Sequence, residues 1–174
     1  MRLTIRTNLA MRTLMFCAVN NGRIVRKHDV AAACNASENH LAQVVNTLAQ
    51  EGFIETQRGR AGGLRLARPM ADISVGEVLR SFEGALPFAE CFDPEANTCP
   101  LRDACLLRDA LQQAVEAFYA TLDRWSLADL VADNAALDRL LHLSGARSLR
   151  ICGTAEAASL RPPQHPGAPS MAEL

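Results

Sequence analysis

Residues 37–67 read SENHLAQVVNTLAQEGFIETQRGRAGGLRLA, and this stretch decides the fold. Its first half places apolar residues at the helical spacing i, i+3, i+4 and i+7: Leu41, Val44, Val45 and Leu48. Ser37 is a good N-cap residue, and Gly52 stands where a helix end needs a left-handed residue. The pattern therefore predicts a helix from Ser37 to about residue 51, followed by a different kind of structure.

The second half of the stretch predicts a β-hairpin. Residues 53–57 and 64–67 have the composition of two short strands, and the loop between them, 58–63, is rich in glycine and carries cations. Upstream, one helix begins at Thr4 or Thr7 and runs to about residue 20, and a shorter helix covers about 26–34. Three helices followed by a two-stranded wing make a winged helix-turn-helix, so the predicted fold class is mainly α.

The second half of the chain is predicted to be helical. Residues 73–82 form a short helix capped by Ser74. A long helix begins at about Pro100, and its apolar stripe consists of Leu107, Leu111, Ala114 or Val115, Phe118, Leu122 and Trp125. A helix so long and so apolar on one side does not stand alone, which predicts a C-terminal dimerisation helix. Further packed helix follows it at 127–141.

The charge distribution divides the chain. Residues 1–69 hold ten basic and four acidic residues, a net charge of +6, whereas residues 70–174 hold eight basic and fifteen acidic residues, a net charge of −7. A basic half of this kind is typical of a module that binds a polyanion. We predict a DNA-binding domain at 1–69, a region with a metal-binding loop and dimerisation helix at 70–143, and a disordered tail at 144–174 that is rich in Gly, Ala, Ser and Pro.

Several function classes are disfavoured by the sequence. With 49% apolar and 21% charged residues the composition is that of a globular protein. No apolar run approaches the ~20 residues of a membrane span. The run near the N-terminus is too short for a secretory signal and is interrupted by Arg12, so we expect a cytoplasmic protein. A thiol redox enzyme is the rival class, but no C-x-x-C motif, phosphate loop or nucleophile elbow is present, so we expect no enzyme.

The helix at 37–51 and the hairpin loop carry the candidate DNA contacts. The face opposite the apolar stripe is polar, and Asn and Gln side chains can pair with adenine in the major groove. The loop cations suit phosphates or a narrow minor groove. The candidate DNA-binding residues are Ser37, Glu38, Asn39, His40, Gln43, Asn46, Arg58 and Arg60. A merely solvated polar face and a mobile hairpin are the alternative.

Three of the six cysteines, Cys91, Cys99 and Cys105, cluster with the spacing C-x7-C-x5-C. Structural zinc sites usually hold cysteines in pairs two to four residues apart, and no such pair occurs here. Wider spacing in a loop suits an iron–sulfur cluster, which thiolates bind. Because Pro100 favours the first helical position, Cys99 is predicted to cap the long helix. A zinc or thiol regulator, or three ordinary cysteines, are the alternatives.

The chain resembles the Rrf-type family of winged-helix regulators, whose known groups include NsrR, RirA and IscR. The resemblance covers about residues 1–143. It is carried by MRLT at 1–4, the wing RGRAGGLRL at 58–66, ISVGEV at 73–78, and the cysteine segment from ECF at 90–92 through CPL at 99–101 to AC at 104–105. Within the family the nitric-oxide-sensing NsrR group is the most similar, on SENHL at 37–41 and LADLV at 127–131.

This resemblance implies a homodimeric repressor that binds a palindromic DNA operator. It also implies that Cys91, Cys99 and Cys105 ligate a cluster, 4Fe–4S in preference to 2Fe–2S, and that nitric oxide relieves repression of nitric-oxide-detoxification genes. An iron-responsive, RirA-like regulator or a cluster-status, IscR-like regulator is the alternative. Two positions depart from the family pattern. Asn8 stands where some NsrR proteins have an aspartate ligand, and Arg108 stands where IscR has a histidine ligand.

Overall fold

The computed structural model describes residues 3–59, 62–84, 87–93, 95 and 97–143. The predicted tail at 144–174, with Cys152, and the wing residue Arg60 lie outside these residues. The helices and strands are α1 Ile5–Val19, α2 Lys27–Ala33, α3 Glu38–Gln50, β1 Ile54–Gln57, β2 Gly63–Leu66, α4 Val75–Glu83, α5 Leu106–Asp123, α6 Leu127–Val131 and α7 Ala135–Leu141. Two short 3-10 helices cover Met70–Asp72 and Glu90–Phe92.

The winged helix-turn-helix predicted from the sequence is confirmed. Helices α2 and α3 are joined by a turn in which Asn35 adopts φ 49°, and Ser37 caps α3 by accepting a hydrogen bond from the backbone N–H of His40. Gly52 has the left-handed φ of 73° that its position after α3 requires. The predicted stripe of α3 is buried against α1 and the hairpin: Leu41, Val44, Val45 and Leu48.

The wing is a two-stranded antiparallel hairpin, and its second strand also forms backbone hydrogen bonds with a residue outside the hairpin. Ile54 pairs with Leu66, and Gln57 pairs with Gly63. Val25, just before α2, exchanges two backbone hydrogen bonds with Leu64, at 2.9 and 2.7 Å. This contact places the backbone of Val25 directly over Gly63, where an added Cβ would lie 2.3 Å from the carbonyl oxygen of Val25. The glycine at position 63 therefore serves the packing of the wing on the helix-turn-helix.

Replacing this glycine should disrupt the wing. We expect Gly63→Ala to lower the free energy of unfolding by about 2–3 kcal/mol, since the obstructing atoms belong to the backbone and cannot rotate away. Chemical denaturation would measure the decrease. The neighbouring exposed residue Arg65 offers a control, because Arg65→Ala removes a side chain without creating a clash. Equal stability of the two variants would contradict the close contact between Val25 and the wing.

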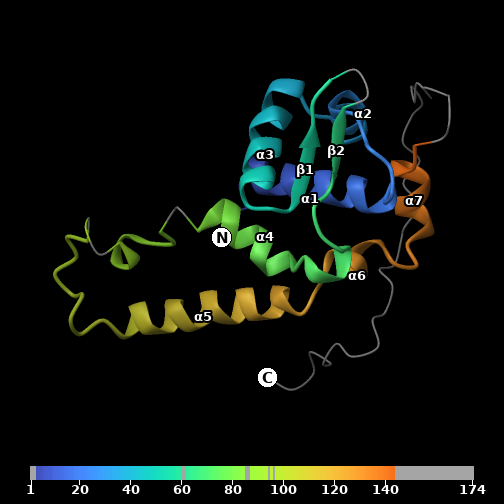
Figure 1. The fold of residues 1–174 in the computed structure, drawn as a ribbon. Coiled ribbons are helices and arrows are strands. Elements are labelled where there is room, and N and C mark those ends of the chain that lie inside the picture. Colours follow the sequence, from blue (N-terminus) through green and yellow to red (C-terminus); the bar gives the residue numbers. More distant parts are fainter. Residues whose placement is uncertain (1–2, 60–61, 85–86, 94, 96, 144–174) are drawn as a thin grey trace, which may run out of the picture. The chain divides into compact units, whose positions relative to one another are not determined.

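Helix α1 lies between the helix-turn-helix and α4, and α5 runs along the other side of α4 (Figure 1). Glu83 at the end of α4 ties it to α1 by accepting hydrogen bonds from the backbone N–H of Thr4, at 2.8 Å, and from the hydroxyl of Thr7. The chain then returns to α1 through α6 and α7, where the Asn20 side chain bonds the backbone of Leu141 and Leu143, both at 2.9 Å. Among the described helices, none is long and apolar enough to cross a membrane.

The long helix is shorter at its start than the sequence predicted. It begins at Leu106, not at Pro100, so the prediction that Cys99 caps it is wrong: Cys105 holds the N-cap position. Residues 100–104 form tight turns instead, in which the N–H of Ala104 bonds the carbonyl of Leu101 at 3.0 Å. Leu101, the large apolar side chain of this segment, is exposed.

Candidate DNA interface and cysteine site

The outer face of α3 is polar and open. All six candidate residues of this helix and its cap lie on the side opposite the buried stripe and are accessible: Ser37, Glu38, Asn39, His40, Gln43 and Asn46. Two of these six side chains already make polar contacts within the protein. Ser37 caps the helix, and a carboxylate oxygen of Glu38 lies 3.1 Å from Nδ1 of His28 on α2. The amides of Asn39, Gln43 and Asn46 are the side chains best suited to pair with base edges.

A basic hollow lies between the wing and the helix-turn-helix. It has a volume of about 540 Å3, and its lining includes Asn46 from α3, Arg58 from the wing, and Arg26 and Lys27 from the start of α2. The three cations are exposed. Arg26 and Lys27 were missed by the sequence analysis. The signal was present, since they are adjacent cations at the start of the helix that crosses the DNA backbone in this motif.

Substitutions in this hollow should act on all DNA sequences alike. We expect Arg58→Ala or Lys27→Ala to weaken binding generally and to reduce the slope of log K against log salt by about one for each phosphate that is no longer neutralised, because phosphate binding releases counterions. Arg60→Ala should do the same. Asn39→Ala and Gln43→Ala should instead relax preference at particular bases, at ~1–3 kcal/mol each. Titrations with a duplex selected from a random-sequence library would separate the two groups, and identical profiles would contradict this division.

The three clustered cysteines lie in the long connection between α4 and α5. Cys91 sits in the 3-10 helix Glu90–Phe92, Cys99 just before the turns at 100–104, and Cys105 at the N-cap of α5. All three are free thiols and all are half-buried. They are therefore accessible, and they belong to an irregular segment that the helices α4 and α5 hold at both ends.

Side-chain contacts join described residues of this connection to one another and to α5. A carboxylate oxygen of Glu90 accepts from both the N–H and the hydroxyl of Thr98, at 2.8 and 2.7 Å. These bonds lower the pKa of Glu90. The guanidinium of Arg108 donates to the carbonyl of Cys91 at 3.1 Å. An open hollow of about 470 Å3 is lined by residues that include Cys91 and Arg108. Arg108 thus fixes the backbone of the loop and, as a permanent cation, is no metal ligand.

The two remaining described cysteines contrast with these three. Cys17 and Cys34 are buried in the core. Burial raises the pKa of the Cys17 thiol to about 12, with Cys34 adding to the effect, and burial likewise raises the pKa of Cys34, against the opposing influence of Arg12. Because the thiolate is the metal ligand, these two residues are poor ligand candidates. The thiol chemistry of the described chain is concentrated in the connection between α4 and α5.

The structure does not bring Cys91, Cys99 and Cys105 into one ligand set. Among the described residues, no group of three or more Cys, His, Asp or Glu side chains lies close enough together to hold a metal ion. Asn8 is exposed on α1 and lines a different hollow, beside Ser37 and His40. The donor chemistry and the accessibility of the three thiols fit a thiolate-bound group.

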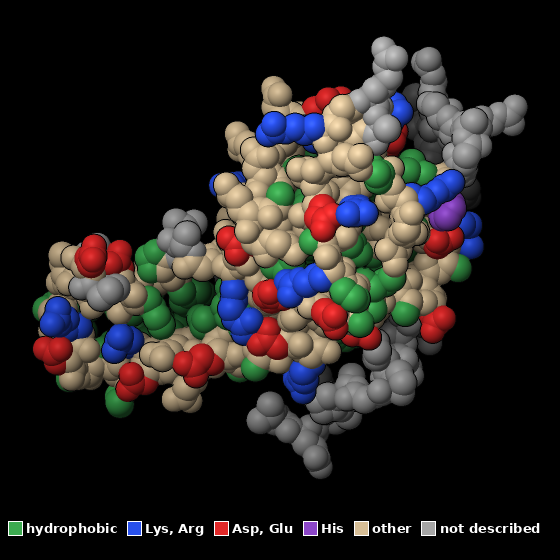
Figure 2. Space-filling view, viewed as in Figure 1, with side chains coloured by type: hydrophobic (Ala, Val, Ile, Leu, Met, Phe, Trp, Pro, Cys, Tyr) green, Lys and Arg blue, Asp and Glu red, His purple; other side chains and the backbone are tan. Residues whose placement is uncertain are grey.

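An apolar surface surrounds the start of α5. Leu106 and Leu107 are 82% and 66% exposed, and Phe88 and Leu101 in the preceding connection are exposed as well. Figure 2 shows apolar side chains gathered between α5 and this connection. Farther along α5 the predicted stripe is only half-buried, at Leu111, Val115, Phe118 and Leu122. A helix with this much uncovered apolar area is typical of an interface with another chain.

A winged helix-turn-helix with an open polar recognition face and a basic hollow defines a DNA-binding protein, and comparison with known proteins gives its family. Residues 3–133 match the Rrf2 family, described as an iron-dependent transcriptional regulator, and the chain belongs to that family. It is therefore a DNA-binding transcription regulator and not an enzyme, as the sequence predicted.

Several relatives are similar over most of their length. The chain is 45% identical over 142 residues to the HTH-type transcriptional regulator NsrR of Geobacillus kaustophilus, covering 81% of this chain and 97% of the relative. It is 40% identical over 143 residues to Protein aau3 of Rhizobium meliloti, covering 82% and 93%. NsrR of Bacillus subtilis is 38% identical over 144 residues, covering 82% and 99%.

Solved structures share the fold. The structure of T. potens IscR superposes with a TM-score of 0.63 at 23% identity, over 78% of this chain and 90% of that one. Oxidised CymR of Staphylococcus aureus superposes with a TM-score of 0.60 at 23% identity, over 76% and 97%. At this level of identity the likeness supports the winged-helix architecture alone.

Proposed function

We propose that the protein is a cytoplasmic transcriptional repressor that senses nitric oxide through an iron–sulfur cluster and controls nitric-oxide-detoxification genes. Family membership and the two NsrR relatives described above support the nitric oxide signal. The observation that carries the proposal is the set of three accessible, free thiols in the connection between α4 and α5, in a chain whose other described thiols are buried.

In this proposal Cys91, Cys99 and Cys105 hold the cluster, of the 4Fe–4S type in preference to 2Fe–2S. When bound, the cluster supplies iron that reacts with nitric oxide. The protein's own residues give the connection its frame: Glu90 fixes it across to Thr98, and Arg108 fixes the backbone at Cys91. Asn8 and Arg108 do not reproduce the fourth ligand of the NsrR or IscR type.

In this proposal the two successive parts of the chain have different roles. Residues 1–69 contact DNA through the exposed face of α3 and the cations around the wing. Residues 70–143 hold the cluster and form the homodimer through α5, which retains exposed apolar area beside the cysteines. A two-fold dimer of this kind reads a palindrome whose half-sites lie about one helical turn, ~34–36 Å, apart.

The alternative is a regulator that responds to iron or to cluster status. The family description as iron-dependent favours it, and so does the asparagine, in place of an aspartate, at position 8. Both proposals use the same three cysteines and the same DNA face. They differ only in which chemical change releases the DNA.

An experiment on anaerobically purified protein tests the proposal. Absorbance with iron and sulfide counts should show a cluster on each chain. DNA binding is then followed during titration with nitric oxide and, separately, during iron chelation. Release at stoichiometric nitric oxide supports the nitric-oxide sensor. Release by the chelator with no response to nitric oxide supports the iron-responsive regulator, and protein that holds zinc or no metal contradicts both.

A further inference from the structure

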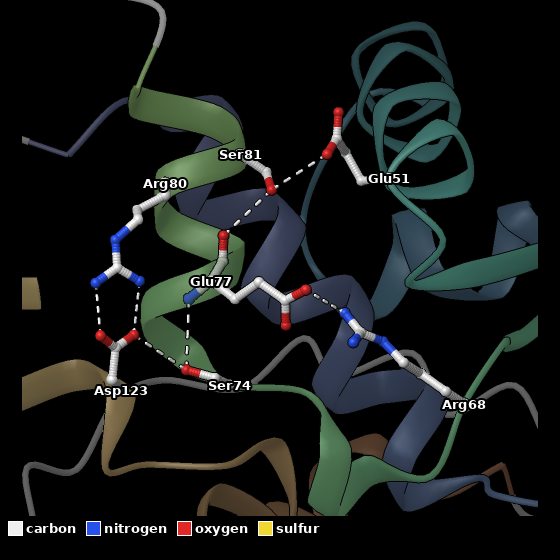
Figure 3. A network of polar contacts seen from close by, with 7 residues as sticks. All are labelled: Glu51, Arg68, Ser74, Glu77, Arg80, Ser81 and Asp123. Carbon is white, nitrogen blue, oxygen red and sulfur yellow. Dashed lines mark hydrogen bonds and ion pairs between the residues drawn. The ribbon is translucent and has the colours of Figure 1, made fainter. Parts of the chain in front are cut away.

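A network of polar contacts links the end of α5 to α4 (Figure 3). Asp123, the last residue of α5, accepts two hydrogen bonds from the guanidinium of Arg80 on α4, at 2.6 and 2.5 Å. The same guanidinium lies 4.6 Å from the ring centroid of Tyr119 on α5. The hydroxyl of Ser74, which caps α4, donates to Asp123 at 3.4 Å. The two helices are thus joined at the N-cap of α4, through Ser74, and in its last turn, through Arg80.

The backbones at this junction also meet directly. A Cβ added to Gly76 would lie 2.1 Å from Oδ1 of Asp123 and 3.0 Å from its backbone nitrogen. Just beyond α5, the carbonyl of Trp125 accepts from the N–H of Val75 at 2.8 Å, and the N–H of Leu127 donates to the carbonyl of Ile73 at 2.8 Å. Because Gly76 has no side chain, the Asp123 carboxylate lies directly against α4, and with the backbone bonds beside it α4 and the end of α5 are expected to move together.

A second junction ties α4 to the base of the wing. Glu77, one turn before Arg80, accepts a hydrogen bond from Nη2 of Arg68 at 2.6 Å. Arg68 lies two residues beyond the end of β2, and its guanidinium is 5.0 Å from the ring centroid of Phe53, the buried residue that precedes β1. The carbonyl of Phe53 also accepts from the N–H of Ala67 at 3.0 Å. Arg68 therefore contacts both Phe53, the residue before the hairpin, and Glu77 on α4.

A contribution to folding stability does not explain the Arg68–Glu77 ion pair well. The two side chains are 32% and 43% exposed, and ion pairs with this exposure contribute little to folding. In addition, Nε of Arg68 is buried and has no hydrogen-bond partner among the described residues, which is an unfavourable arrangement. The contacts of Arg68 are better explained by the two elements that they join, the base of the wing and α4.

We infer that Arg68 and Glu77 are positioning residues of the DNA interface. They hold the wing to α4, and because α4 is joined to α5, the position of α5 determines where the wing lies beside α3. The inference rests on the proposed function for its biological sense, since the cysteine connection lies between α4 and α5. A change in that connection would then reach the wing cation Arg58 without passing through α3. The opposing hypothesis is that the contact between Val25 and Leu64 fixes the wing alone.

The test uses the full-length cluster-loaded protein and a duplex selected from a random-sequence library. We expect Glu77→Gln to leave iron content and thermal midpoint unchanged, to weaken DNA binding about tenfold, or ~1.4 kcal/mol, and to lower the salt slope by about one. Arg58→Ala should add little to Glu77→Gln, since a misplaced wing no longer brings Arg58 to the DNA. Such non-additivity between distant residues is the sign of coupling.

Glu55→Gln is the matched control. It makes the same change in net charge and also breaks an ion pair of the wing, that of Glu55 with Arg65, but this pair lies within the hairpin and does not reach α4. We expect affinity and salt slope close to those of the parent. The double variant Glu77→Arg with Arg68→Glu exchanges the two charges and should restore part of the affinity. It replaces Glu77→Gln in the test if that single variant folds poorly.

The inference would be overturned if the effects of Glu77→Gln and Arg58→Ala on DNA affinity were additive. It would also be overturned if the salt slope of DNA binding by Glu77→Gln equalled that of Glu55→Gln. This outcome is distinct from failure of the proposed function. The comparison is made within one form of the protein, so it stands even if nitric oxide proves not to be the signal.

Discussion

Alanine at any one of positions 91, 99 or 105 should abolish the cluster. We expect Cys91→Ala, Cys99→Ala and Cys105→Ala each to reduce iron and sulfide to background after anaerobic reconstitution, and to weaken operator binding to the level of the cluster-free protein. The reason is that thiolates hold such clusters, and these are the accessible thiols of the described chain. Absorbance, iron and sulfide counts measure the first effect, and gel-shift titration measures the second.

The buried cysteines supply the control. Cys17→Ala should retain the cluster, because its thiol is in the core and its pKa is raised to about 12. Cys152→Ala, outside the described residues, should also retain it. Full iron and sulfide in any one of the three loop variants would remove that residue from the ligand set.

The second large effect concerns the dimer. We expect Leu107→Asp to raise the dissociation constant of the dimer at least about 100-fold. A two-fold interface loses the same leucine twice, at ~1.5–3 kcal/mol each, and gains two buried charges. Leu107 is 66% exposed in the single chain, so the fold itself should tolerate the change. Sedimentation velocity would show a shift toward monomers at micromolar concentration.

Leu140→Asp is the matched variant for this prediction. Leu140 is 71% exposed on α7, away from the apolar surface around α5, so this variant should remain dimeric. A parent protein that sediments as a monomer would contradict the homodimer itself. A dimeric Leu107→Asp would place the interface elsewhere, and either result would leave the apolar start of α5 without an explanation.

Local patterns predicted the DNA-binding part of the fold well. The stripe from Leu41 to Leu48, the cap at Ser37 and the stop at Gly52 all act within one helix, and each is confirmed in the structure. Such signals are strong because spacing, capping and backbone conformation are properties of adjacent residues. The hairpin was found to within one residue at each strand for the same reason.

The features that the sequence analysis missed depend on residues far apart in the chain. The need for glycine at position 63 arises from the backbone of Val25, which lies much earlier in the chain. Arg26 and Lys27 are adjacent in the sequence, but only the structure places them in one hollow with the wing cation Arg58. The pairing of Arg68 with Glu77 gives no local signal, because it joins the end of a hairpin to a later helix.

The most direct test of the central claim is a comparison of operator binding by one preparation in three forms. Cluster-loaded, nitric-oxide-treated and cluster-free protein would be titrated against the same selected duplex, with sedimentation run in parallel. We predict tight binding by the loaded dimer and weak binding by the other two forms, all three remaining dimeric. Cluster-free protein that binds the operator as tightly as the loaded form would contradict the claim that the cysteines control DNA binding.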